Sequence, residues 1–200
     1  WNRQPLQDKT ILVCSEQGVG DELYFSSYLP KLIEISGKVI LETDQRLTHL
    51  FKESLGEISV FPYSRRIEYE QPVFNYGWLP KSIYPDFYID LASLPHFLTE
   101  EGMSPLNQFG YLKISKDARD YWTKYLFEIS GGRPIIGLCW RSGLNTIDRQ
   151  HWYPPLHLWE QVLTTPNVCF LSLQYDDDTE DIKFFKEQFG VSMIKLSNID

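Results

Sequence analysis

The stretch Thr10-Ile-Leu-Val-Cys14-Ser-Glu16-Gln-Gly-Val-Gly20-Asp21 decides the fold of this 200-residue chain. Its first five residues, Thr10 to Cys14, are an apolar and β-branched run, which is typical of a strand buried on both faces of a sheet. The polar, glycine-rich segment Glu16–Gly20 cannot continue that strand and predicts a tight turn. Asp21 is then expected to be the N-cap of a helix, because apolar residues recur at helical spacing as far as Ile33. Strand, loop and helix in this order predict the opening unit of a parallel α/β domain.

The same alternation continues through the first half of the chain. Further strands are expected at Lys38–Glu42, Ile58–Phe61 and Phe87–Leu91, and further helices at Arg46–Leu55 and Ala92–Leu98. Residues Pro62 to Pro85 contain several prolines, glycines and aromatic residues, so irregular structure is expected there. Met103 to Phe109 is expected to be a loop.

A second block begins after a double glycine. The apolar spacing over Lys116–Ser130 predicts a helix, and Gly131-Gly132 is expected to end it. The block that follows has strands at Pro134–Trp140, Val168–Leu173 and Met193–Leu196 and helices at Leu156–Thr164 and Thr179–Phe189. We therefore expect two α/β domains, residues 1–131 and 132–200, with the second one incomplete.

Composition limits the classes of function. The net charge of −8 and the isoelectric point near 5.0 disfavour a nucleic-acid or membrane surface. No apolar run approaches the roughly twenty residues that span a bilayer. The three cysteines, Cys14, Cys139 and Cys169, lie in strand-like runs without metal-ligand spacing, so we expect buried, reduced thiols and a cytoplasmic location.

The loop after the first strand is the first candidate site. Gly18 and Gly20 allow a ligand to approach the main chain closely, and Gln17 lies beside them. The carboxylate of Asp21 competes with a phosphate at the same helix end, so an acceptor hydroxyl that needs a general base suits this loop better. The alternative, that Asp21 only caps the helix and the glycines only turn the chain, is equally compatible with the pattern.

The loop after the first strand of the second block is the other candidate. It runs from Trp140 to Arg149 and contains Arg141 and Ser142. Ligands of parallel α/β sheets bind at this edge, and either guanidinium matches the oxygens of a diphosphate. The alternative is that Arg141 and Arg149 are surface residues paired with Asp148 or Asp120.

Other chemistry-bearing residues indicate no catalytic centre. The histidines have no metal-ligand spacing, and the acidic run Asp176–Asp181 is interpreted as a charged cap at the start of a helix. The chain contains no nucleophile elbow, no P-loop and no GxGxxG motif, which disfavours an ATPase or an NAD enzyme. No metal and no cofactor are expected.

Several motifs in order resemble a known family. They are Trp1, Pro5–Val13, Glu16–Asp21, Tyr28–Leu32, Ala92–Pro95, Gly110–Leu112 and Ile136–Gly143. Together they look like the glycosyltransferase module that bacteria fuse behind tetratricopeptide repeats. That module is similar to the heptosyltransferases of glycosyltransferase family 9 and, more distantly, to O-GlcNAc transferase.

The resemblance implies a GT-B enzyme with two Rossmann-like domains, the first binding the acceptor and the second the nucleotide-sugar. It implies an inverting, metal-independent transfer to a saccharide or protein hydroxyl, with Asp21 as the base. Donor contacts are then expected from the two loops, at Gln17, Gly18, Gly20, Trp140, Arg141, Ser142 and Arg149.

The resemblance also has a gap. The family's later donor-binding segment has no counterpart before Asp200, so this piece alone is expected to transfer sugar poorly, and the edge of its unfinished sheet to favour self-association. A non-catalytic sugar- or protein-binding module with a degenerate GT-B fold is the alternative.

Overall fold

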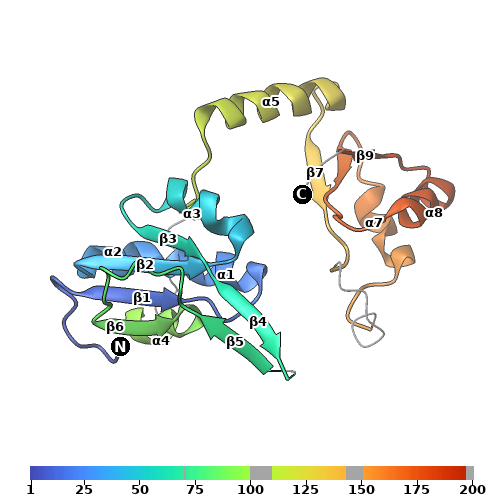
Figure 1. Cartoon of the computed structure of the whole chain (residues 1–200). Coiled ribbons are helices and arrows are strands. Elements are labelled where there is room, and N and C mark those ends of the chain that lie inside the picture. Colours follow the sequence, from blue (N-terminus) through green and yellow to red (C-terminus); the bar gives the residue numbers. More distant parts are fainter. Residues whose placement is uncertain (70, 100–109, 143–150, 197–200) are drawn as a thin grey trace. The chain divides into compact units, whose positions relative to one another are not determined.

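The computed structural model describes residues 1–69, 71–99, 110–142 and 151–196. It consists of two compact units, Trp1–Ser115 and Lys116–Asp200, each with its own parallel sheet (Figure 1). The predicted α/β class is therefore confirmed. The predicted loop Met103–Phe109 lies outside the described residues. No helix in the described part of the chain is long and apolar enough to cross a membrane.

The sheet of the first unit has four parallel strands in the order β3-β2-β1-β6. They are β1 (Thr10–Cys14), β2 (Lys38–Thr43), β3 (Ser59–Pro62) and β6 (Phe87–Asp90). β1 is an inner strand, and four of its five residues are buried, as the apolar run predicts. Because all four strands are parallel, their carboxyl ends meet at one edge, where Cys14 lies opposite Asp90.

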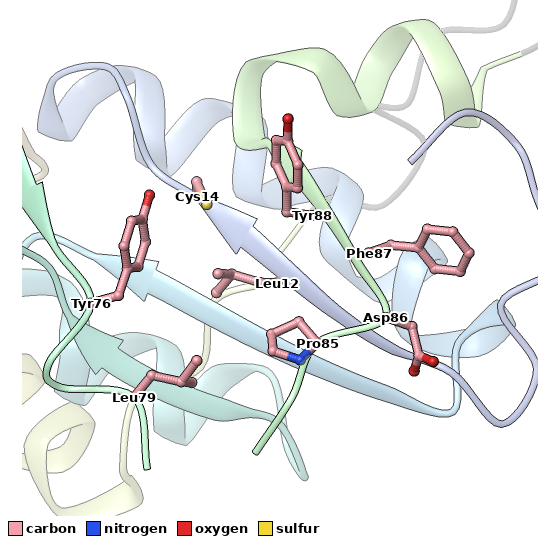
Figure 2. A pocket seen from close by; sticks show the side chains of 8 residues that line it. All are labelled: Leu12, Cys14, Tyr76, Leu79, Pro85, Asp86, Phe87 and Tyr88. Atoms are coloured by element: carbon pink, nitrogen blue, oxygen red, sulfur yellow. The ribbon is translucent and has the colours of Figure 1, made fainter. Parts of the chain in front are cut away.

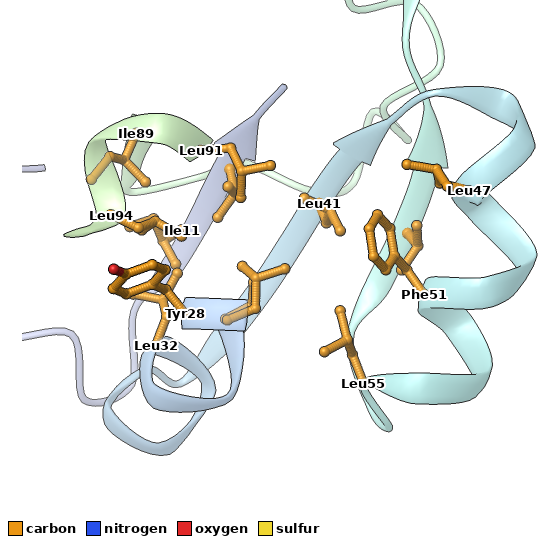
Figure 3. Packing of buried hydrophobic residues seen from close by; sticks show 14 of the residues in the cluster. Ile11, Tyr28, Leu32, Leu41, Leu47, Phe51, Leu55, Ile89, Leu91 and Leu94 are labelled. Atoms are coloured by element: carbon orange, nitrogen blue, oxygen red, sulfur yellow. The ribbon is translucent and has the colours of Figure 1, made fainter. Parts of the chain in front are cut away.

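Helices cover one face of this sheet. The helical segments are α1 (Val19–Phe25), η1 (Ser26–Tyr28), α2 (Leu29–Ile35), η2 (Gln45–Leu47), α3 (Thr48–Ser54), η3 (Leu91–Ser93) and α4 (Leu94–Leu98). They enclose a core around Ile11, Leu32, Leu41 and Phe51, all fully buried (Figure 3). Burial of each such side chain contributes about 1.5–3 kcal/mol.

The first predicted helix is interrupted. Its residues form α1, the 3₁₀ turn η1 and α2 instead of one continuous helix. Pro30 lies in the first turn of α2, where its missing N–H is tolerated, whereas the middle of a longer helix would lose a hydrogen bond there. Apolar spacing alone does not reveal this break.

A hairpin and a loop lie at the other face of the sheet. β4 (Ser64–Glu68) and β5 (Gln71–Asn75) pair antiparallel, where the sequence predicted irregular structure. Both are strands of a two-stranded ribbon, in which proline is tolerated, and Tyr69 adopts a positive φ of 50° in the turn. The Arg65 guanidinium carbon lies 3.7 Å from the centre of the Tyr63 ring and 5.1 Å from that of Phe74, its partner on β5.

The second unit has three parallel strands in the order β7-β8-β9. Its elements are α5 (Lys116–Ser130), β7 (Ile135–Leu138), η5 (Leu156–Trp159), α7 (Glu160–Leu163), β8 (Cys169–Ser172), α8 (Thr179–Phe189) and β9 (Met193–Lys195). Trp140, Leu163, Phe170 and Phe185 form its buried core.

The helix α5 has the predicted bounds, but it belongs to the second unit. The chain divides into its two units between Ser115 and Lys116, whereas the sequence predicts a boundary near Gly131. The thiol of Cys169 in β8 contacts the Ser130 carbonyl (3.6 Å), and Gly132 N–H donates to Phe127 (3.0 Å), so the end of α5 is fixed to β8 and to the following turn. A glycine stop therefore ends the helix without ending the compact unit.

Two of the three thiols are buried as predicted, and the third is not. Cys14 and Cys169 lie within buried strands, whereas Cys139 is exposed because β7 already ends at Leu138. The apolar run Pro134–Trp140 thus continues past the strand that it predicts.

Gly37 makes a close main-chain crossing that can be tested. A Cβ atom there would lie 2.7 Å from the main chain of Asp8 and Lys9, so Gly37→Ala should lower the free energy of unfolding by about 1–3 kcal/mol in urea titrations. Gly20→Ala is the matched control, because no atom lies within 4 Å of its Cβ position and alanine favours a helix. Equal stability of the two variants would contradict the crossing.

Candidate functional site

Asp21 lies in the first turn of α1 and is not its N-cap. The helix begins at Val19 with Gly18 as N-cap, and the Gly18 carbonyl accepts a hydrogen bond from Glu22 N–H (2.9 Å). Glycine is accepted at an N-cap, so the N-cap lies three residues before the aspartate. The Asp21 side chain is exposed and forms no hydrogen bond or ion pair with any described residue. Its carboxylate is therefore open to a substrate.

Two glutamates fix the loop before α1 to neighbouring strand ends. Glu22 is 1% exposed, and its Oε2 accepts hydrogen bonds from the Thr43 hydroxyl (2.5 Å) and Asp44 N–H (2.9 Å) after β2. Glu16 Oε1 accepts one from Ala92 N–H (3.2 Å) after β6. The sequence prediction missed Glu22, because a charged residue in a first helical turn is ordinarily exposed.

A buried carboxyl group lies at the end of β2. Glu42 is 1% exposed, and burial raises its pKa to about 7, although the nearby Arg65 cation opposes this rise. Glu22 adds to the rise as a like charge. Glu42 Oε1, Glu22 Oε1, and Nε and Nη2 of Arg65 are buried and have no hydrogen-bond partner within the described residues. The carboxyl edge of the first sheet thus contains both donors and acceptors that its own fold leaves unsatisfied.

Asp44 is held ionised beside this group. Arg46 donates to it from Nε and Nη2 (both 3.0 Å), and the Tyr63 hydroxyl donates as well (3.0 Å). These hydrogen bonds, the largest from Arg46, hold the pKa of Asp44 well below its usual range. The edge therefore has one carboxyl group that titrates near neutrality and one that remains charged.

In the second unit, a buried glutamine fixes the loop after β7. The side chain of Gln174 is 3% exposed, and its Oε1 accepts from the main-chain N–H groups of Trp140 (3.0 Å) and Arg141 (3.1 Å). Its Nε2 donates to the Arg141 carbonyl (3.0 Å). The two consecutive loops after β7 and β8 are joined in this way, which the sequence could not show because no motif marks Gln174.

Arg141 is paired within its own unit. Its guanidinium forms ion pairs with Asp176 (3.0 Å) and Asp181, and it donates to the Asp177 carbonyl (2.7 Å). Its side chain is only 14% exposed. Arg141 is thus paired, but unlike the predicted alternative it is not a surface residue, and its described partners are Asp176 and Asp181 instead of Asp120. Arg149 and Asp148 lie outside the described residues.

The remaining predicted donor contacts differ in accessibility. Trp140 is buried and its indole N–H donates to Asp181 (2.8 Å), so its ring serves the core. Ser142 is half-buried beside Arg141, and Gln17, Gly18 and Gly20 are exposed in the first unit.

The acidic run before α8 is more than a cap. Asp177 does accept from Thr179 N–H (3.1 Å) at the helix start, as expected of a cap. Asp178, however, is fully buried, accepts from the Ser172 hydroxyl (2.5 Å) and pairs with Lys195. Within the described ranges no group of three or more His, Cys, Asp or Glu side chains could hold a metal ion.

Comparisons with known proteins support the fold. The chain is 34% identical over 208 residues to Protein FlbA of Caulobacter vibrioides, a match that covers the whole chain and 34% of that protein. The chain thus spans about a third of the relative's length. The crystal structure of a family 9 glycosyl transferase from Veillonella parvula matches the whole chain and 72% of that structure, with a TM-score of 0.61 and 12% identity. No family model matches the chain. The chain therefore has a glycosyltransferase-like, Rossmann-like α/β fold.

The raised pKa of Glu42 predicts a pH dependence of stability. Between about pH 4.5 and 7 the folded chain keeps a proton that the unfolded chain releases, so the free energy of unfolding falls as pH rises through this window. Glu42→Gln should remove roughly 1–3 kcal/mol of the loss between pH 5 and pH 8 in urea titrations. The control Glu57→Gln, at an exposed site, should show the same fall in unfolding free energy between pH 5 and pH 8 as the parent. An equal fall in Glu42→Gln would be evidence against a buried acid.

Removal of the Arg141 cation should destabilise the second unit. Arg141→Met leaves Asp176 and Asp181, both largely buried, without their partner, and should cost about 2–4 kcal/mol in unfolding free energy. Lys183→Met removes an exposed ion pair with Glu180 and should cost less than about 1 kcal/mol. A similar cost for both variants would show that the Arg141 ion pairs do not stabilise the fold.

Proposed function

We propose that this chain is part of a glycosyltransferase that moves a sugar from a nucleotide-sugar to an acceptor hydroxyl. The reaction is inverting and metal-independent, and it yields the glycosylated acceptor and a nucleoside diphosphate. The likeness of the whole chain to a family 9 glycosyl transferase structure supports this proposal. The observation that carries it is the carboxylate of Asp21, which is exposed, has no partner among the described residues and lies just beyond the carboxyl end of the buried strand β1.

Asp21 acts as the general base in this proposal. It accepts the proton of the acceptor hydroxyl while the oxygen attacks the anomeric carbon and the bond to the diphosphate breaks. Its exposure allows contact with an acceptor, and within the described ranges no residue occupies either carboxylate oxygen. Glu16 is a poorer candidate, because its Oε1 already accepts from Ala92 and its Oε2 is buried.

Each of the two loops would supply substrate contacts within its own unit. Gln17, Gly18 and Gly20 offer exposed main chain in the first unit, and Arg141, Ser142 and Arg149 offer polar groups in the second. Trp140 contributes by holding the loop through its buried indole and Asp181. In this proposal the departing diphosphate is stabilised by positive charge in place of a metal ion.

One observation favours a second candidate, a non-catalytic binding module. The charge of Arg141 is already balanced by Asp176 and Asp181, so a diphosphate would have to replace carboxylates to reach it. Such a module would bind a saccharide or protein without a complete donor site. Binding of uridine and guanosine diphosphate sugars by the full-length protein, measured by calorimetry with Arg141→Met alongside, separates the two. Saturable binding of a donor supports the transferase, and its absence supports the module.

Asp21→Asn tests the proposed base. Asparagine preserves the size of the side chain but cannot take a proton, so turnover of the full-length enzyme should fall about 10²–10⁴-fold with donor affinity nearly unchanged. Asp117→Asn, at an exposed position in the first turn of α5, is the matched control and should leave turnover unaltered. Turnover of Asp21→Asn within a few-fold of the parent would move the search for the base elsewhere.

A further inference from the structure

A cavity of about 410 Å³ lies on the sheet face that carries Leu12 and Cys14. The residues that line it include Leu12, Cys14, Tyr76, Pro85, Tyr88 and Asp86, whose carboxylate pairs with Lys9. Figure 2 shows Tyr76 and Tyr88 on either side of Cys14, with Leu12 between them at the base. Tyr76 directly follows β5, whereas Tyr88 lies on β6. The cavity is therefore lined by separate segments of the chain and not by one loop.

The cavity exists because helices do not cover this part of the sheet. Trp78, Leu79 and Ile83 pack over Leu12 and Ile40, which closes the neighbouring area of the face. Tyr88 on β6 remains 68% exposed and Tyr76 remains 46% exposed. Large exposed aromatic side chains beside an apolar floor are typical of a ligand site.

The shape and chemistry of the walls favour a ring. Leu12, Leu79 and Pro85 offer no hydrogen-bonding side chain, so a strongly hydrated group would lose water there without compensation. The two tyrosine rings can contact another aromatic ring by edge or face, which adds to the burial of apolar area.

The charges around the inner end exclude an anion. Asp90 lies opposite Cys14 in the sheet, and Glu42 is close to both. Burial, together with Glu42 and Asp90, raises the pKa of Cys14 to about 12. Burial, followed by Cys14 and Glu42, raises the pKa of Tyr76 to about 12 as well. Burial is the largest cause for both groups and the nearby carboxyl groups add to it, so a bound anion would lose hydration and also lie close to like charge.

We propose that this cavity is a binding site for an aromatic ring that bears no negative charge. The carboxyl groups of Asp86 and Asp90 favour an uncharged or cationic ring over an anionic one. An aromatic side chain of a polypeptide and a small aromatic molecule share this chemistry. None of the residues that line the cavity has a role in the proposed sugar transfer.

Three probes that differ in charge and carry the same phenyl ring test the site. They are 2-phenylethanol, phenethylamine and 3-phenylpropionate, titrated into the full chain without any nucleotide-sugar and followed by amide chemical shifts in NMR. The alcohol and the amine should bind with Kd of about 1–10 mM, and the carboxylate at least about tenfold more weakly. N-acetylphenylalaninamide distinguishes the sources: tighter binding than the alcohol indicates a polypeptide, and weaker binding a small molecule.

Matched variants locate the effect. Tyr88→Ala should weaken binding of 2-phenylethanol about 3- to 10-fold, while Tyr69→Ala, at a 98% exposed tyrosine outside the cavity, should leave it unchanged. Asp90→Asn should reduce the difference in Kd between 2-phenylethanol and 3-phenylpropionate. Tyr88, Tyr69 and Asp90 are all exposed, so these variants keep the core intact.

Two results would overturn the proposal. One is equal binding of the carboxylate and the alcohol, and the other is an absence of shifts around Cys14 and Tyr88 with either uncharged or cationic probe. Because no nucleotide-sugar is present, these failures leave the proposed transfer untouched, and loss of turnover in Asp21→Asn leaves the ring site untouched.

Discussion

The parallel pairing of β1 with β2 and β6 is the constraint on which the first unit depends. Parallel strands have evenly spaced hydrogen bonds and place all their carboxyl ends at one edge. The residues that follow each strand must therefore share a small volume, whatever their charges. Glu22 and Glu42 are neighbours for this reason and both are buried, whereas Asp21, one residue before Glu22, is exposed.

In the second unit, charged groups also follow neighbouring parallel strands, but they form ion pairs with one another. After β7 and β8, carboxylates and a guanidinium lie in adjacent loops, and they neutralise one another through Arg141, Asp176 and Asp181. In the first unit the corresponding groups are mostly acids, with Arg65 stacked on Tyr63 as the nearby cation. The cation of the second unit is thus paired with carboxylates, whereas in the first unit the like charge of Glu22 helps to raise the pKa of Glu42.

Much of the fold could be predicted from sequence because it rests on local patterns. The apolar run of β1 and the helical spacing of α5 and α8 predicted elements close to those observed, since burial on both faces or on one stripe dictates such patterns. The hairpin β4–β5 was missed because its pairing joins residues of two segments, such as Arg65 and Phe74, and no pattern within one segment shows it. Among the site residues, Asp21 and Arg141 stand beside visible turns, whereas Glu42 and Gln174 matter through tertiary burial that no local pattern encodes.

The exposure of Cys139 has a practical consequence. Cys14 and Cys169 are enclosed, and the high pKa of Cys14 keeps its thiol protonated, so alkylating reagents at neutral pH should attach to one position in the chain. That position directly precedes Trp140 and Arg141 and contacts the Gln174 side chain. A fluorophore or spin label placed there would sit at the loop itself, and its signal would report on the surroundings of that loop without any engineered cysteine.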